Sequence, residues 1–178
     1  MVKASNIVAA ASAVFIFAAD LAFAQQMNVD INRISESGVG EKIGNVAITE
    51  EIGVLSFKVA VTGLPEGQRG FHVHEKGDCG PAMKDGKMTA GIAAGEHYDP
   101  EGKKSHKGPQ GIGHKGDLPA LTANSQGKVD QMVTAPRLKL SDILGRSLMI
   151  HEGGDTYSDT PESGGGKGRI ACGVVPKQ

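Results

Sequence analysis

Alternation of apolar and polar residues at a period of two is the feature of this sequence that most restricts its fold. The pattern is clearest in VLSFKVAV, where Leu55, Phe57, Val59 and Val61 occupy every second position. Successive side chains of a β-strand point to opposite faces, so this pattern predicts a strand with one buried face. Seven more segments are predicted as strands: NVDINRI, NVAITE, FHVH, LPALTAN, VDQMVTA, RSLMIHEG and RIACGVV.

Two long segments between the predicted strands show no periodicity. Residues 75–119 and 152–168 are rich in Gly, Asp and other polar residues, and loops of such length in a compact domain are either functional or disordered. The segment LKLSDILG is predicted to be a loop or one short helical turn. The sequence therefore predicts an all-β fold of eight antiparallel strands, an immunoglobulin-like sandwich or Greek-key barrel with two long functional loops.

The N-terminus has the pattern of a secretory signal peptide. Lys3 precedes the apolar run IVAAASAVFIFAA, and AFA at positions 22–24 supplies small residues for cleavage. We expect a signal peptide over residues 1–24 and a single domain over residues 25–178. A membrane anchor is the weaker alternative, because Asp20 interrupts a run that is short for a bilayer span. We expect no membrane anchor after cleavage, since no cysteine follows the signal to carry a lipid.

Export changes how the two cysteines are interpreted. An oxidising compartment allows an isolated pair of cysteines to persist as a disulfide. Cys79 and Cys172 are the only two in the chain, so they form the only intramolecular bridge available. A disulfide between them is predicted, and two buried free thiols are the alternative.

The overall charge gives no indication of a charged partner. The chain has 19 basic and 20 acidic side chains and a formal net charge of −1. No overall field therefore favours nucleic acid or an anionic membrane as a partner.

The histidines are confined to three zones of the sequence. A strand places residues two apart on one face, about 6–7 Å from each other, so the histidines of FHVH can hold one ion between them. The alternative is two polar residues on the solvent-exposed face of a strand. Neutral imidazoles in a cluster suit copper or zinc. The three zones contain His72 and His74; His97, His106 and His114; and His151.

Counting possible ligands favours two metal ions that share one residue. His151, at the end of another predicted strand, can supply a third imidazole to the first site. The middle zone offers three histidines and Asp117, a set of three nitrogens and one carboxylate that zinc accepts. Two four-coordinate ions need eight contacts from these seven side chains. The shortage disappears if one histidine bridges both ions.

Five motifs resemble those of bacterial periplasmic copper,zinc superoxide dismutases, and the resemblance extends through nearly the whole mature chain. They are GFHVHEKGDC, AGEHYDP, GHKGDLPAL, MIHEGGDTYSD and GGGKGRIACGVV. The resemblance implies one copper and one zinc ion per subunit, with His97 as the bridge. The implied copper ligands are His72, His74, His97 and His151, and the implied zinc ligands are His97, His106, His114 and Asp117.

The same resemblance implies a reaction and the residues that perform it. Two superoxide anions and two protons would give oxygen and hydrogen peroxide, as antioxidant defence in the periplasm. Arg169 would guide and hold the anion beside copper, and His97 and Arg169 would be the catalytic residues. Asp155 would link His72 to His106, and Cys79 and Cys172 match the disulfide of the family. A homodimer is compatible with the resemblance.

Several residues remain open to more than one interpretation. Glu96 precedes the expected bridge where a small residue is expected, and Tyr98 follows it. Met83 and Met88 could contact a copper donor or be ordinary loop methionines. Four lysines could steer superoxide or form a solvated loop face: Lys103, Lys104, Lys107 and Lys115.

Two functions of other classes compete with the dismutase. A secreted copper or zinc carrier on the same fold would need neither an anion guide nor a bridging histidine. A zinc hydrolase would need an open coordination position, which the complete zinc set does not leave.

Overall fold

The structure, a computed structural model, describes residues 26–177. The predicted signal peptide, residues 1–24, lies outside the described residues. In residues 26–177 no helix is long and apolar enough to cross a membrane. The helical elements are η1 (Ile92–Ala94), α1 (Leu140–Ile143) and η2 (Glu162–Gly165). The strands are β1 (Gln26–Ser35), β2 (Gly38–Glu51), β3 (Val54–Val61), β4 (Gly67–Arg69), β5 (Phe71–His74), β6 (Ala82–Lys84), β7 (Lys87–Thr89), β8 (Leu121–Ala123), β9 (Val129–Ala135), β10 (Ser147–His151) and β11 (Arg169–Val174).

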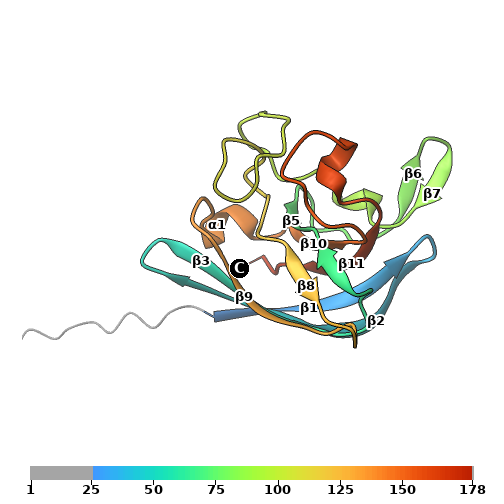
Figure 1. Cartoon of the computed structure of the whole chain (residues 1–178), viewed down its shortest axis with the longest axis horizontal. Helices are drawn as coiled ribbons and strands as arrows, with labels where there is room; N and C mark the ends of the chain where they lie inside the picture. Colours follow the sequence, from blue (N-terminus) through green and yellow to red (C-terminus); the bar gives the residue numbers. More distant parts are fainter. Residues whose placement is uncertain (1–25, 178) are drawn as a thin grey trace, which may run out of the picture.

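Seven strands form one curled antiparallel sheet in the order β5-β10-β11-β1-β2-β3-β9 (Figure 1). Strands β4 and β8 pair separately, and β6 and β7 form a hairpin. Strands far apart in sequence lie side by side, such as β11 beside β1 and β9 beside β3. The predicted all-β class is confirmed, and the architecture is the Greek-key barrel.

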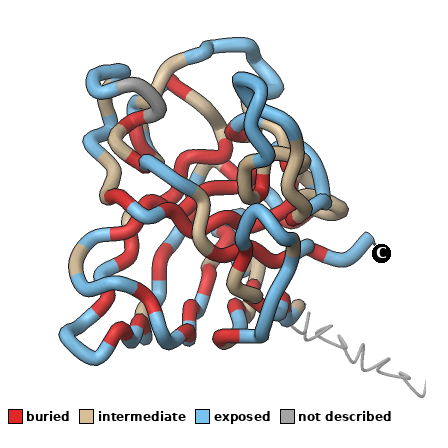
Figure 2. The backbone as a smooth tube through the Cα atoms, turned by 90° about the vertical axis from the view of Figure 1, so that its right-hand side faces the viewer, coloured by how far each residue is buried: buried red, intermediate tan, exposed pale blue. Residues whose placement is uncertain are grey.

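The core lies inside the curl of the sheet, and buried residues recur at every second position of the strands, as the sequence predicts. On β3, Leu55, Phe57 and Val59 are fully buried, while Lys58 between them is exposed. The Phe57 ring meets the ring of Phe71 on β5 edge to face, with centroids 6.0 Å apart. Figure 2 shows the same alternation of buried and exposed positions along the strands. Burial of this continuous apolar face provides the main stabilisation of such a sheet.

The eight predicted strands are all present, and the structure adds three short ones. Strand β4 lies between two predicted strands, in a segment for which no strand was predicted, and the β6–β7 hairpin lies in residues 75–119, which were predicted to lack regular structure. That prediction was wrong for the hairpin. The turn residues Asp85 and Gly86 have φ values of 51° and 76°, and Asp-Gly is a common hairpin turn. Its strands have only three residues each, too few to show a period.

The long loops gather at one end of the barrel and cover β5 (Figure 1). The sequence predicts Phe71 and Val73 on the core side of β5, with His72 and His74 on the opposite face. All four residues are buried. The second face of β5 is therefore not exposed to solvent, which excludes the interpretation of these histidines as solvent-facing polar residues.

The predicted disulfide between Cys79 and Cys172 is present. Cys172 lies on β11 between β1 and β10, where its register partners are Asn32 and Met149. Cys79 lies near the start of the long loop that follows β5. The bridge therefore fastens this loop to the middle of the sheet, three residues from Arg169.

Candidate metal centre

Strand β5 is paired along both of its edges, with β10 on one side and with the loop over residues 75–119 on the other. The contacts with the loop are two isolated bridges. His72 is bridged to Asp117, and His74 is bridged to His97. Four candidate ligands from three parts of the sequence are thus brought together by backbone pairing along one strand.

Gly116 allows the loop to approach β5 closely. The Val73 N–H donates to the Gly116 carbonyl at 2.9 Å, and the Tyr98 N–H donates to the Val73 carbonyl at 2.8 Å. A Cβ atom at position 116 would lie 2.4 Å from the Val73 carbonyl oxygen, which is too close for any side chain. The second glycine of the GHKGDLPAL motif, Gly116, is therefore required for the packing that places Asp117 beside His72.

His151 enters the same region from the end of β10. Its backbone N–H donates to the Gly70 carbonyl at 2.9 Å, just before β5 begins. The side chain is 3% exposed. The pairing of β10 with β5, in which Ile150 is the partner of Phe71, carries His151 to the edge of the histidines on β5.

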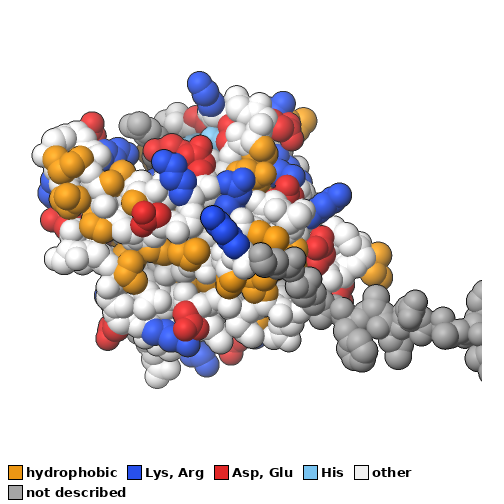
Figure 3. Space-filling view, turned by 180° about the vertical axis from the view of Figure 1, so that it is seen from behind, with side chains coloured by type: hydrophobic (Ala, Val, Ile, Leu, Met, Phe, Trp, Pro, Cys, Tyr) orange, Lys and Arg blue, Asp and Glu red, His pale blue; other side chains and the backbone are white. Residues whose placement is uncertain are grey.

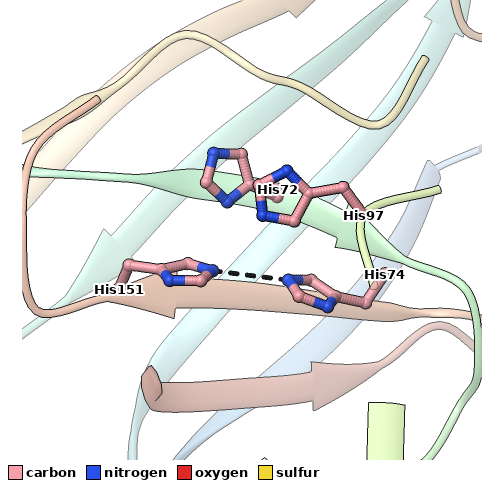
Figure 4. A group of neighbouring side chains, drawn as sticks. All are labelled: His72, His74, His97 and His151. Carbon is pink, nitrogen blue, oxygen red and sulfur yellow. Dashed lines mark hydrogen bonds between the residues drawn. The ribbon is translucent and has the colours of Figure 1, made fainter. Parts of the chain in front are cut away.

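Four histidines form a buried cluster, hereafter the copper-type cluster (Figure 4). Each offers a nitrogen within 4.8 Å of a nitrogen from every other member. The Nε2 atoms of His74 and His151 are 3.3 Å apart, and the rings of His72 and His97 stack with centroids 3.8 Å apart. The members are His72, His74, His97 and His151.

For His72 and His74, neighbouring groups determine which ring nitrogen is left free for a metal ion. The Nδ1 atom of His74 donates to the Gly95 carbonyl at 3.0 Å, which leaves Nε2 as the lone-pair nitrogen. The Nε2 atom of His72 lies 3.0 Å from both carboxylate oxygens of Asp155. Nδ1 of His72 is buried and has no hydrogen-bond partner among the described residues. Such contacts commonly orient metal-ligating histidines and fix their tautomers.

Burial keeps the imidazoles of this cluster uncharged. Burial, followed by the nearby His97, lowers the pKa of His72 and of His74 well below the usual value. The same causes lower the pKa of His151 to about 3. A neutral imidazole has a free lone pair, which is the form that binds a metal ion.

Three histidines form a second cluster beside the first, hereafter the zinc-type cluster: His97, His106 and His114. Asp117 approaches two of them, with Oδ1 at 3.0 Å from Nδ1 of His97 and 3.6 Å from Nδ1 of His114. Burial alone would raise the pKa of Asp117, but His114 and His97 lower it to about 2. The second oxygen of this ionised carboxylate, Oδ2, is buried without a partner in the described part of the chain.

The two clusters have the donor sets that copper and zinc require. Four neutral imidazoles suit copper, and three imidazoles with one carboxylate suit zinc. Among the described residues, His97 is the member common to both clusters. The unpaired Nδ1 of His72 and Oδ2 of Asp117 each lack a partner that a metal ion would supply. The residues present therefore fit one ion of each metal, with His97 between them.

Two aspartates support the histidines from outside the clusters. Asp155 contacts His72 as the resemblance implies, and burial, with the charge of Asp117 adding to it, raises the pKa of Asp155 to about 7. The described contacts do not include the implied partner, His106. Asp159 instead accepts a hydrogen bond from the backbone N–H of His106 at 2.7 Å and lies 3.2 Å from its Nδ1. The sequence did not single out Asp159, because an aspartate in a Gly- and Ser-rich loop is common and carries no spacing signal.

A pocket of about 480 Å³ opens above both clusters. Its wall includes His97, His114 and His151, so both clusters border one cavity. Arg169 also lines it, and the backbone pairing of β10 and β11 makes this arginine the register partner of His151. Figure 3 shows a small area of histidine surface among acidic and basic side chains at the upper end of the molecule.

Some of the lysines line this pocket, and others form ion pairs with acidic residues. Of the four that the sequence singles out, Lys104 borders the pocket. The pocket is also lined by Lys84 and Lys167. The sequence did not single out these two, because they lie far in sequence from the four lysines named above. The other three of the four pair with acidic residues: Lys103 with Glu101, Lys107 with Asp159, and Lys115 with Asp142.

Met83 and Met88 are cross-strand partners in the β6–β7 hairpin and are 60% and 43% exposed. Lys84 and Thr89 of the same hairpin line the pocket. Because side chains alternate along a strand, the two methionines lie on the face of the hairpin opposite these residues. A role in contacting a copper donor stays a prediction.

Comparison with known proteins agrees with this geometry. Residues 42–175 match the profile of the family described as copper/zinc superoxide dismutase. A superoxide dismutase [Cu-Zn] of Brucella abortus is 51% identical over 156 residues, covering 86% of this chain and 90% of the relative. The corresponding protein of Escherichia coli K12 is 50% identical over 149 residues, covering 83% of this chain and 86% of the relative.

Solved structures give the same result. The copper/zinc superoxide dismutase from Brucella abortus superposes with a TM-score of 0.83 at 50% identity, covering 85% of this chain and 99% of that structure. The monomeric enzyme from Salmonella enterica superposes with a TM-score of 0.75 at 47% identity, covering 85% of this chain and 99% of that structure. The chain therefore belongs to the copper/zinc superoxide dismutase family.

Proposed function

We propose that this chain removes superoxide in the bacterial periplasm, with each cluster holding one metal ion. The overall reaction converts two superoxide anions and two protons into oxygen and hydrogen peroxide. The observation that carries this assignment is the position of His97 in both clusters. In the proposal, copper is held by His72, His74, His97 and His151, and zinc is held by His97, His106, His114 and Asp117.

Copper, when bound, supplies the one-electron exchange, and the protein supplies charge, geometry and protons. The contact of Asp117 with Nδ1 of His97 supports a role in which Nδ1 stays on the zinc side. Nε2 of His97 is then the atom that can hold a proton and give it to the reduced oxygen species. The ring is only 5% exposed, which limits the access of bulk water to that proton.

Arg169 is proposed to hold the superoxide anion. Its guanidinium is planar and permanently charged, so it can hydrogen-bond a small anion without losing a proton. Its side chain lines the pocket that borders both clusters. A carrier protein has no need for an anion-binding group at this position, so Arg169 favours the dismutase over the carrier.

Metal analysis of single variants tests the ligand assignments. His74→Ala should lower copper content and spare zinc, while His114→Ala should lower zinc content and spare copper. Asp99→Asn is the control, because Asp99 lines the same pocket and belongs to neither cluster. Equal loss of both metals in the two histidine variants would contradict the division into two sites.

The predicted signal segment and the disulfide support export to the periplasm. An isolated structural disulfide is typical of proteins from oxidising compartments. Cell fractionation followed by mass spectrometry should find the protein in the periplasmic fraction, beginning at Gln25. An uncleaved chain recovered with the membranes would contradict both the cleavage site and the absence of an anchor.

The oligomeric state and the lack of a nucleic-acid partner stay predictions. The sequence is compatible with a homodimer, whereas the Salmonella enterica relative is described as monomeric. Light scattering of the purified protein across a range of concentrations distinguishes one copy from two. A mobility-shift assay with DNA and RNA at physiological salt tests the expectation that nucleic acid does not bind.

A further inference from the structure

Glu96 places a carboxylate over the arginine that faces the metal pocket. The residue immediately precedes His97, at a position where a small residue is expected from the family resemblance. One carboxylate oxygen, Oε2, lies 3.7 Å from an Nη2 nitrogen of Arg169, and both residues line the pocket. The Glu96 side chain is 79% exposed and that of Arg169 only 8%. The carboxylate therefore approaches the guanidinium from the solvent side.

Arg169 is held in place and cannot follow Glu96 outward. Its Nη1 donates to the Gly91 carbonyl at 2.7 Å. Gly91 has φ = 68°, and a Cβ atom there would lie 3.2 Å from Cδ of Arg169 and 2.8 Å from Ile34. The close packing against Gly91 fixes the arginine stem. The Nη2 edge is left as the donor available to an incoming anion, and Glu96 faces that edge.

Glu96 has a backbone held by hydrogen bonds and a loosely held side chain. Its backbone N–H donates to Oε2 of Glu75 at 3.3 Å, and its carbonyl accepts from the Glu75 N–H at 3.0 Å. No further contact of the Glu96 carboxylate is found among the described residues besides the long one to Arg169. A side chain so exposed can swing away from the arginine without any change in the loop.

We propose that Glu96 is an internal competitor for the anion site, occupying Arg169 until an anion displaces it. This inference rests on the proposed role of Arg169 as the anion-binding group. A superoxide anion must displace the carboxylate and bind beside its negative charge. Glu96 would then lower the affinity of the pocket for every small anion. An exposed ion pair contributes enough free energy to change affinity by up to about five-fold.

Azide binding to the copper- and zinc-loaded protein tests the proposal without measuring turnover. Azide is a small monovalent anion whose binding to copper is followed in the absorption spectrum. Glu96→Gln keeps the shape of the side chain and removes its charge, and should lower the azide dissociation constant about two- to five-fold at low salt. The gain should disappear at 1 M salt, where the screening length falls to about 3 Å.

Two further variants test whether the effect comes from the negative charge of Glu96 beside Arg169. One changes the shape of the side chain and keeps its charge, and the other changes the net charge of the protein at a different residue. Glu96→Asp keeps the charge and should leave azide affinity much closer to that of the unmodified protein. Glu101→Gln changes net charge by the same amount at an exposed residue that pairs with Lys103, and should have no effect. Equal effects of Glu96→Gln and Glu101→Gln, or of Glu96→Gln and Glu96→Asp, would overturn the proposal.

Failure of this inference is distinct from failure of the proposed function. If the unmodified protein removes superoxide but binds azide no more weakly than its Glu96→Gln variant, the dismutase is retained and the competitor is excluded. Arg169→Ala provides the remaining check. With the arginine removed, Glu96→Gln should lose its salt-dependent effect, and persistence of that effect would show that Glu96 does not act through Arg169.

Discussion

Oδ1 of Asp117 lies 3.0 Å from Nδ1 of His97, and both side chains are buried. These residues come from different parts of the longest loop, and β5 holds each through a separate backbone bridge. The orientation of His97 is therefore determined by the protein itself. Such preorganisation lets one imidazole direct different nitrogens to two neighbouring sites.

Replacing His97 by Ala should remove communication between the two metal sites. The copper spectrum of the unmodified protein should change when zinc is removed, because in the proposed arrangement His97 would contact both ions. In the variant, zinc removal should leave the copper spectrum unaltered. A variant whose spectrum keeps the sensitivity to zinc would refute the assignment of His97 as the bridge.

Replacing Asp155 by Asn should weaken copper binding. Asp155 contacts Nε2 of His72 and so keeps Nδ1 directed into the copper-type cluster. Loss of such an outer contact commonly lowers metal affinity about 10- to 100-fold. Competition with a copper chelator measures the change. Asp130→Asn is the matched control, since Asp130 pairs with Lys58 on the barrel surface, and an equal effect there would contradict a specific role of Asp155.

Replacing Cys172 by Ser should lower thermal stability and loosen the loop after β5. The bridge closes a chain segment with a sequence separation of 93, for which chain-entropy models give about 4–5 kcal/mol. Calorimetry of the variant measures the loss, and hydrogen exchange should show reduced protection after Glu75. An unchanged melting temperature together with unchanged metal retention would show that the bridge does not constrain the loop.

Asp142 should make stability depend on pH in the acidic range. Burial alone would raise the pKa of Asp142, but Lys115 and the backbone N–H of Lys139 lower it, with Oδ2 at 2.8 Å from each. A carboxyl whose folded pKa is depressed stabilises the fold above its unfolded pKa, near 4, and loses this contribution as the pH falls through the folded pKa.

Asp142→Asn keeps an oxygen that can accept from the Lys139 N–H but removes the charge beside Lys115, and should therefore cost up to about 1 kcal/mol of unfolding free energy at pH 7. The difference from the unmodified protein should shrink steadily below pH 4. Urea unfolding at pH 7, 5 and 3 checks this dependence. A difference that is constant over the three pH values would show that the ionised carboxylate is not the source of the stabilisation.

The barrel was predictable from sequence because its strands carry the period of two. Leu55, Phe57 and Val59 are buried as that period requires. The β6–β7 hairpin was not predicted, since its strands are too short to show a pattern. The burial of His72 and His74 was also not readable from the local sequence, because it depends on loops that are distant in sequence.

The candidate histidine ligands were predictable because all six histidines of the chain are confined to three zones. Their grouping needed the resemblance to a known family, because spacing alone does not say which loop residue reaches β5. The contact of Asp159 with His106 and the approach of Glu96 to Arg169 were not predicted. Both contacts join segments more than 50 residues apart in sequence, and each depends on how the loops fold over the barrel.

The most direct test is superoxide removal by the exported protein after its metal content has been measured. Protein with one copper and one zinc ion per chain should remove superoxide, and removal should cease when copper is withdrawn and return when copper is restored. Full occupancy of both sites without superoxide removal would contradict the proposed function and leave a metal carrier as the remaining explanation.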